Sequence, residues 1–139
     1  MAATIYTVGY AVNRGATAKH DIAHLMAADP ATVLVDIRKS PNSRWYPYRQ
    51  PALQQCYGGR YIHMPQLGNV NWQFKNLPIV LEDPAAGLPQ LLALLRAERS
   101  IILICACATV RNPDGSPKCH RLIVAELLAE QCCKEIIHV

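Results

Sequence analysis

The chain has 139 residues, of which 51% are hydrophobic and 17% are charged. This length suits one domain over residues 1–139, and so apolar a composition excludes a disordered chain because enough surface can be buried to offset the entropy of folding. The net charge of +4 is mild, which disfavours an extended nucleic-acid track and suits a small anionic ligand.

Short β-branched runs alternate with amphipathic stretches along the chain. The β-branched runs predict strands at residues 4–8, 32–37, 60–64, 101–106 and 135–139. The amphipathic stretches predict helices at residues 17–28, 52–57, 88–98 and 121–131. This alternation is typical of a three-layer α/β domain with a mostly parallel central sheet of about five strands and helices on both faces.

Two longer segments have no regular pattern. Residues 38–51 contain three prolines and are predicted to form a long loop, which in a compact domain is usually functional or mobile. Residues 65–84 are irregular, and we expect Trp72 and Phe74 to pack beneath that segment.

Cellular location follows from the apolar runs. The longest, residues 101–110, is far shorter than the about 20 residues of a membrane span, so no membrane partner is expected. The N-terminus lacks a basic segment that leads into an apolar stretch, which predicts no secretory signal and a cytoplasmic protein. In that compartment the six cysteines are expected to be reduced, as packing residues, metal ligands or catalytic thiols.

Reactive side chains follow the carboxyl ends of the predicted strands. They are Tyr10, Asp36, Arg38, His63 and Cys105, with Cys119, His120 and Arg121 at the start of the helix after the fourth strand. Because open α/β sheets bind ligands outside these carboxyl ends, we predict that these groups converge on one pocket. The alternative is that they are polar only because loops are polar.

Four motifs in the chain occur in a fixed order. They are TVGYA (residues 7–11), VDIRKSPNSR (35–44), HMPQLG (63–68) and LICAC (103–107), the last followed by CHR (119–121). Together they resemble the domain-of-unknown-function 488 family of small bacterial and archaeal α/β proteins. The resemblance spans nearly the whole chain, implies an α/β fold and points to Asp36, Arg38, Cys105, Cys119, His120 and Arg121, but it implies no activity. Members of that family usually carry an acidic residue where this chain has Cys107, so a base or ligand there is missing.

The cysteines favour two kinds of site. Cys105 and Arg111 have the Cys-x5-Arg spacing of phosphatase and rhodanese loops, in which backbone amides and the arginine hold an anion while the thiolate attacks. The segment between them, residues 106–110, has no glycine, which disfavours such a loop. Cys119 lies at a predicted helix N-terminus, which lowers the pKa of a thiol, and Arg121 can clamp an anion. The alternative is an ordinary helix start with a buried cysteine and a surface arginine.

A zinc site is a further alternative. Cys105, Cys107, Cys119 and His120 are soft ligands, but structural zinc sites use pairs separated by two to four residues. The observed spacing fits such a site poorly, so the leading prediction includes no metal and no cofactor, and a metal-stabilised structural domain is the second alternative.

Residues 38–49 combine four cations with three aromatic residues. Aromatic faces stack on bases and cations neutralise phosphates, which indicates contact with a nucleotide or a single strand. The alternative is a proline-stiffened lid in which Asp36 simply pairs with Arg38 or Arg44.

The leading prediction is an enzyme whose strand-end pocket binds a phosphate, nucleotide or carboxylate. Cys105 or Cys119 is the predicted nucleophile, His120 or His63 the base, and Asp36 an acid–base group or a group that orients an arginine. The predicted ligand-binding residues are Tyr10, Arg38, Arg44, His63, Arg111 and Arg121. The alternative function is a non-catalytic nucleotide or nucleic-acid binding module that uses residues 38–49, and the oligomeric state is left open.

Overall fold

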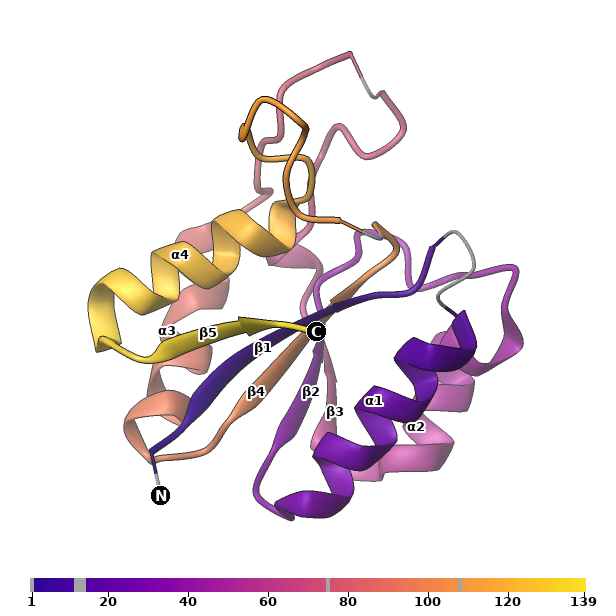
Figure 1. Ribbon diagram of the computed structural model, residues 1–139, viewed down its shortest axis with the longest axis vertical. Helices are drawn as coiled ribbons and strands as arrows, with labels where there is room; N and C mark the ends of the chain where they lie inside the picture. The colour runs from indigo at the N-terminus through magenta and orange to yellow at the C-terminus, as the bar shows by residue number, and fades with distance from the viewer. Residues whose placement is uncertain (1, 12–14, 75, 108) are drawn as a thin grey trace.

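The computed structural model describes residues 2–11, 15–74, 76–107 and 109–139. Within these residues five parallel strands form one sheet in the order β3-β2-β4-β1-β5 (Figure 1). The strands are β1 (Thr4–Gly9), β2 (Val33–Asp36), β3 (Tyr61–His63), β4 (Ile101–Cys105) and β5 (Glu135–His138). The helices are α1 (Gly15–Ala28), α2 (Gln50–Tyr57), α3 (Pro84–Arg96) and α4 (His120–Cys132), with 3-10 turns η1 (Tyr46–Tyr48), η2 (Gly58–Arg60) and η3 (Pro65–Leu67). The predicted α/β architecture is confirmed.

Helices cover both faces of the sheet, α1 and α2 on one and α3 and α4 on the other (Figure 1). Side chains alternate along each strand, so β4 supplies Ile101 and Leu103 to the α3–α4 face and Ile102 and Ile104 to the α1–α2 face. Both faces of β4 are therefore buried, which explains why its sequence is apolar at every position.

The connections that leave β1 and β4 run in opposite directions. α1 carries the chain from β1 past β4 to β2, whereas α4 carries it from β4 past β1 to β5. Right-handed crossovers then place α1 and α4 on opposite faces. Gly9 and Cys105, which are paired in register at the ends of β1 and β4, lie where the direction reverses. Ligands of open α/β sheets bind at such points.

The start of α3 differs from its predicted start by four residues. Asp83 caps the helix through its Oδ1, which accepts a hydrogen bond from the Ala86 N–H at 3.2 Å. Pro84 follows in the first turn, where its fixed φ suits a helix and its missing N–H costs nothing. Capping and proline chemistry therefore extend the helix beyond its leucine pattern.

The segment between η3 and α3 exposes the aromatic residues that we expected to be covered. Trp72 and Phe74 are 53% and 54% exposed, so the prediction that they pack beneath this segment is wrong. Asn69 folds the loop onto itself, because its Oδ1 accepts hydrogen bonds from the N–H groups of Asn71 and Val80, each at 3.0 Å. These hydrogen bonds tie the described part of the loop to itself and leave the side chains of Trp72 and Phe74 exposed.

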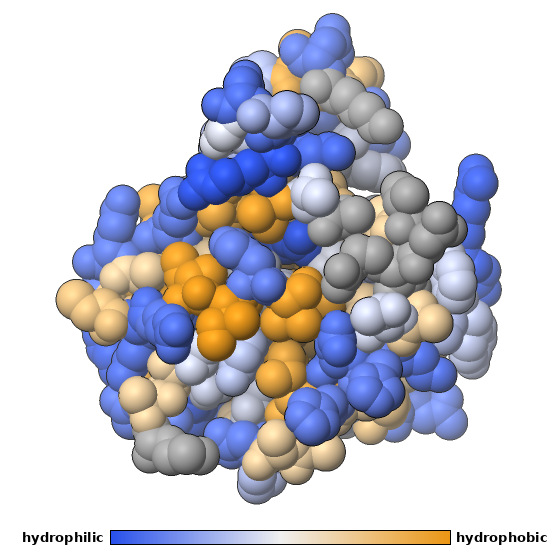
Figure 2. Space-filling model, viewed as in Figure 1, coloured by the Kyte–Doolittle hydropathy of each residue, from blue (hydrophilic) through white to orange (hydrophobic). Residues whose placement is uncertain are grey.

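One edge of the sheet is formed by β5. Figure 2 shows apolar surface gathered where β5 crosses the front of the molecule, and Ile137 is among its exposed residues. Among the described residues, no helix has both the length and the apolar character needed to cross a bilayer.

Candidate functional site

Asp36, Arg38 and Tyr10 meet at the carboxyl edge of the sheet in a buried polar cluster, which we call the Asp36 cluster. Arg38 donates from Nε and Nη2 to the two carboxylate oxygens of Asp36, at 2.7 and 2.5 Å, and from Nη1 to the Tyr10 hydroxyl at 2.8 Å. The Tyr61 hydroxyl donates to Asp36 Oδ2 at 2.5 Å. The Tyr10 ring stacks on Tyr48 with centroids 4.2 Å apart.

Electrostatics keep two members of the Asp36 cluster, Arg38 and Tyr61, protonated. Burial lowers the pKa of Arg38, but hydrogen bonding and the charge of Asp36 raise it more, so the guanidinium stays charged. Burial and the hydrogen bond to Asp36 raise the pKa of Tyr61 well above its usual value, so the phenol stays a donor. Asp36 and Arg38 thus engage each other, as in the pairing alternative for residues 38–49, and both are buried.

Two predicted histidines bind the main chain that follows β2. His63 Nε2 lies 2.8 Å from the Arg38 carbonyl oxygen, and His120 Nε2 lies 2.9 Å from that of Ile37. A carbonyl oxygen only accepts, so Nε2 carries the proton in both rings. Burial lowers the pKa of His120, so its ring is neutral and its Nδ1 is an acceptor. That Nδ1 lies 3.8 Å from Cys119 Sγ.

Three cysteines form a second cluster, which we call the cysteine cluster. Cys105 ends β4, Cys107 follows two residues later, and Cys119 is the residue before α4. Their Sγ atoms all lie within 4.8 Å of one another, and those of Cys105 and Cys119 are 2.7 Å apart. Cys105 and Cys119 are each 1% exposed, whereas Cys107 is half-buried. A molecule from solvent therefore reaches Cys107 first.

The three thiols have unlike acidities. Hydrogen bonds from Cys105 and Cys119, together with the charge of Arg121, lower the pKa of Cys107 far below its usual value. Burial raises the pKa of Cys105. The hydrogen bond with Cys105 lowers the pKa of Cys119, but the hydrogen bond to Cys107 and burial raise it more, to about 12. The arrangement is thus one thiolate held by two thiols.

Gly9 and Arg121 close the inner side of the cysteine cluster. A Cβ on Gly9 would lie 1.6 Å from the Cys107 carbonyl oxygen and 2.4 Å from Arg121 Nη1, so only glycine allows this approach. Arg121 is 2% exposed and lies in the first turn of α4. Its side chain is inside the protein and not on the surface, and its positive charge there favours a thiolate nearby.

The remaining predicted arginines lie outside both clusters. Arg44 is exposed on the loop before η1. Arg111 is exposed, and it donates to Glu126 Oε1 of α4 and to the Gly115 carbonyl oxygen, each at 3.0 Å. Its guanidinium is therefore engaged away from the sulfur atoms. Ala108, inside the Cys-x5-Arg segment, lies outside the described residues.

The cysteine cluster could hold a thiophilic cation such as Zn²⁺, because three thiolates are soft ligands. Two sulfur ligands of one tetrahedral zinc, with Zn–S bonds of about 2.3 Å, lie about 3.8 Å apart. Cys105 and Cys119 are closer, at 2.7 Å. Their separation suits a direct sulfur–sulfur interaction better than a shared metal ion.

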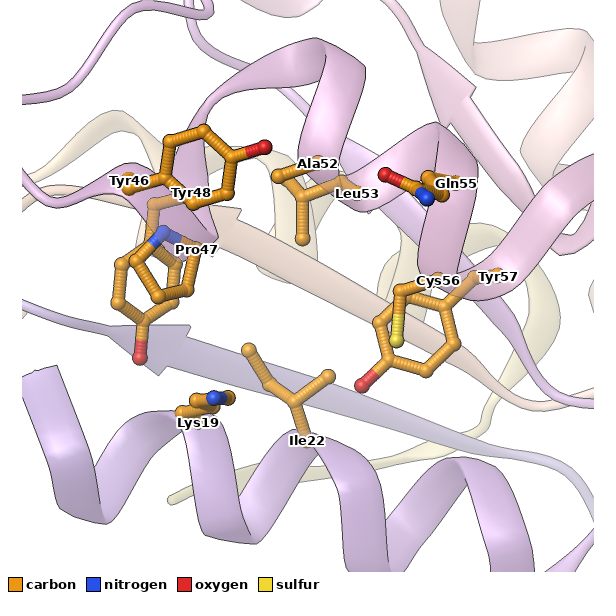
Figure 3. A pocket seen from close by; sticks show the side chains of 10 residues that line it. All are labelled: Lys19, Ile22, Tyr46, Pro47, Tyr48, Ala52, Leu53, Gln55, Cys56 and Tyr57. Atoms are coloured by element: carbon orange, nitrogen blue, oxygen red, sulfur yellow. The ribbon is translucent and has the colours of Figure 1, made fainter.

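A cavity of about 290 Å³ lies elsewhere, between α1 and α2. Figure 3 shows its mainly apolar lining, with Ile22, Leu53 and three tyrosines around the opening and Lys19 at one side. None of the residues predicted at the strand ends lines this cavity, whereas Tyr46, Pro47 and Tyr48 of the predicted ligand-contacting segment, residues 38–49, do. The predicted strand-end residues therefore pack into two side-chain clusters and do not line an open pocket. This cavity is separate from both clusters.

Three residues of the two clusters were not among the predicted site residues. Tyr61 completes the Asp36 cluster, Gly9 makes room for the cysteine cluster, and Cys107 was considered only as a zinc ligand or as a departure from a family pattern. The Cys-x-Cys spacing was the available signal for Cys107, because residues two apart in an extended segment point to the same side. Nothing local in the sequence marked Tyr61 as a partner of Asp36.

The sequence matches the family model "Domain of unknown function DUF488" over residues 19–128, most of the 139-residue chain. Comparisons with curated proteins and with solved structures found no match. The matched range includes Asp36, Arg38, the three clustered cysteines and Arg121. The resemblance inferred from the four motifs is confirmed, and the chain belongs to the DUF488 family.

Proposed function

We propose that this protein is a cytoplasmic thiol enzyme whose nucleophile is Cys107 and whose substrate is a small anionic electrophile. One observation carries the proposal: the three Sγ atoms lie within 4.8 Å, and the outermost of them belongs to the cysteine that the other two stabilise as a thiolate. The thiolate is the reactive form of cysteine. We assign the nucleophile to Cys107 in place of Cys105 or Cys119 because those two are buried and protonated.

The surrounding groups have separate roles in this proposal. Cys105 and Cys119 donate hydrogen bonds to the Cys107 thiolate, and Arg121 supplies a buried positive charge. His120, fixed by the Ile37 carbonyl, presents Nδ1 to Cys119 and can accept its proton. The same positive charge and the start of α4 favour an anionic substrate over a neutral one.

Alkylation of the full-length protein tests the nucleophile. Iodoacetamide is expected to modify Cys107 at pH 6 at least about tenfold faster than the exposed Cys56, because hydrogen bonds from its neighbours keep Cys107 in the reactive thiolate form at that pH. Cys107→Ser should abolish the fast phase and Cys56→Ser should leave it intact, with peptide mass spectrometry as the readout. The proposal fails if Cys107 reacts no faster than Cys56.

Substrate charge is tested with a pair of reagents of similar size. Iodoacetate is anionic and iodoacetamide is neutral, so their rate ratio at Cys107 reports the local field. We expect that ratio to exceed the ratio at Cys56, and to fall toward it as salt screens the charges. Equal ratios at the two cysteines would remove the preference for anions.

Nucleotide binding by residues 38–49 is a second candidate. It is supported by the exposure of Trp45 and Tyr46 and by Arg49, whose guanidinium lies 5.9 Å from the Tyr46 ring centroid. Titration of tryptophan fluorescence with a short single strand should show binding that weakens steeply with salt. Trp45→Ala should lose that binding while Trp72→Ala, on the other exposed loop, keeps it. No change in the titration of the wild-type protein would exclude this candidate.

A further inference from the structure

We infer that the cysteine cluster is a thiol–disulfide exchange centre, which takes in a low-molecular-weight disulfide at Cys107 and stores the oxidation as a buried Cys105–Cys119 disulfide. This inference rests on the proposed function, because it names the substrate class of the same site. The inference assigns Cys105 and Cys119 as resolving thiols, in addition to the nucleophile Cys107.

The contact between Cys105 and Cys119 is the first observation behind it. Their Sγ atoms are 2.7 Å apart, closer than the about 3.5 Å at which even smaller carbon atoms make optimal contact. The two residues belong to different elements, the end of β4 and the start of α4. Little movement of either element is needed to bring these sulfur atoms to bonding distance.

The order of burial is the second observation. Cys107 is half-buried, while Cys105 and Cys119 lie behind it with 1% exposure each. A disulfide from solvent therefore meets Cys107 first, and the inner thiols meet the mixed disulfide that forms there. A thiol–disulfide exchange needs this succession of an accessible attacking thiolate and a nearby resolving thiol.

The first step forms one bond and breaks one. The Cys107 thiolate attacks one sulfur of the substrate RSSR, the substrate S–S bond breaks, and RS⁻ leaves. Cys107 is now joined to SR in a mixed disulfide. The released RS⁻ is the reduced half of the substrate.

Two further exchanges move the oxidation inward. Cys119 passes its proton to His120 Nδ1, 3.8 Å away, and attacks the Cys107 sulfur; the second RS⁻ leaves and takes that proton. Cys105 then attacks the Cys119 sulfur, which frees the Cys107 thiolate, and the Cys105 proton goes to the first RS⁻. The sum is one RSSR reduced to two RSH, and two thiols oxidised to one disulfide.

Glutathione disulfide is the probe for the test. The full-length, fully reduced protein is incubated with it, quenched with acid and analysed by mass spectrometry of proteolytic peptides. We expect the wild-type protein to accumulate a Cys105–Cys119 crosslink with two glutathiones released per protein, and dithiothreitol to reverse the reaction.

Variants separate the steps. Cys119→Ser should stop at one glutathione bound to Cys107, Cys105→Ser should stop at a Cys107–Cys119 crosslink, and Cys107→Ser should react at least about tenfold more slowly than wild type. Cys56→Ser is the matched control and should behave as wild type. Circular dichroism before the reaction shows whether each variant is folded, and the wild-type crosslink stands without any variant.

The outcomes distinguish this inference from the proposed function. If Cys107 is alkylated rapidly but its glutathione adduct persists in the wild-type protein, the exchange centre is wrong and the thiol enzyme stands. If Cys107 is no faster than Cys56 with either reagent, both fail. If the isolated protein holds one zinc per chain that blocks all three thiols, the cluster is a metal site and both fail.

Discussion

The Asp36 cluster and the cysteine cluster occupy the same edge of the sheet, yet they differ in what they leave available for chemistry. In the Asp36 cluster a carboxylate, a guanidinium and two phenols are joined by hydrogen bonds of 2.5 to 2.8 Å. In the cysteine cluster three identical groups compete for a single negative charge. In the Asp36 cluster, groups of opposite charge neutralise one another and have a structural role. In the cysteine cluster, three neighbouring thiols acquire different pKa values, and one of them stays a reactive thiolate.

His120 connects the two clusters. Its Nε2 binds the main chain between Asp36 and Arg38, and its Nδ1 faces Cys119. The scaffold therefore fixes the orientation of the ring that serves the reactive cluster. This division of roles predicts that damage to the first cluster lowers stability and that damage to the second lowers reactivity.

The largest expected effect is on the scaffold. Asp36→Ala leaves the charge of Arg38 buried without its carboxylate, which costs about 3–5 kcal/mol of unfolding free energy. Urea denaturation measures this loss. The control is Glu82→Ala, which breaks the more exposed pair with Lys39 and should cost less than about 1 kcal/mol. Equal losses in the two variants would contradict a scaffold role for Asp36.

Gly9→Ala affects the cysteine cluster through a steric clash. The added methyl meets the Cys107 carbonyl oxygen and the Arg121 side chain, so we expect about 1–3 kcal/mol of destabilisation and slower alkylation of Cys107. Gly59→Ala is the matched control, because a Cβ there meets nothing within 4 Å. The proposed packing is wrong if Gly9→Ala leaves the alkylation rate and the stability at wild-type values.

The acidity of His120 predicts a smaller, pH-dependent effect. Burial lowers its pKa from 6.5 in the folded protein, so the unfolded chain binds the proton first as the pH falls. The resulting stabilisation is present above pH 6.5 and is lost below it, by at most about 1.4 kcal/mol per pH unit. Urea denaturation at pH 7.5 and 5.5 should show a smaller drop for His120→Gln than for wild type. His20→Gln, whose side chain is 83% exposed, should keep the wild-type drop.

The smallest expected effect is at Arg111. Arg111→Ala removes an exposed ion pair with Glu126, which should change stability by less than about 1 kcal/mol. It should leave the rate of Cys107 alkylation unchanged, because its guanidinium is engaged by α4 and the Gly115 carbonyl. A tenfold loss of rate with iodoacetate would instead favour the Cys-x5-Arg loop that the spacing suggested.

The α/β fold could be predicted from the sequence because the patterns that indicate strands and helices are local. The apolar run predicted as a strand at residues 101–106 forms the buried central strand β4 over Ile101–Cys105, since a parallel strand covered on both faces is apolar at every position. The four motifs likewise identified the family. The start of α3 was missed because a cap and a proline, and not the leucine pattern, determine it.

The sequence by itself determined that reactive residues follow the ends of parallel strands, because strand direction brings those ends to one edge. Only the tertiary structure decided which of them meet. Tyr61 is 25 residues from Asp36, and Cys119 is 14 residues from Cys105, and no local pattern encodes such distances. Burial depends on all the packed neighbours of a residue. It makes the Asp36 cluster structural and leaves Cys107 accessible as a reactive thiolate.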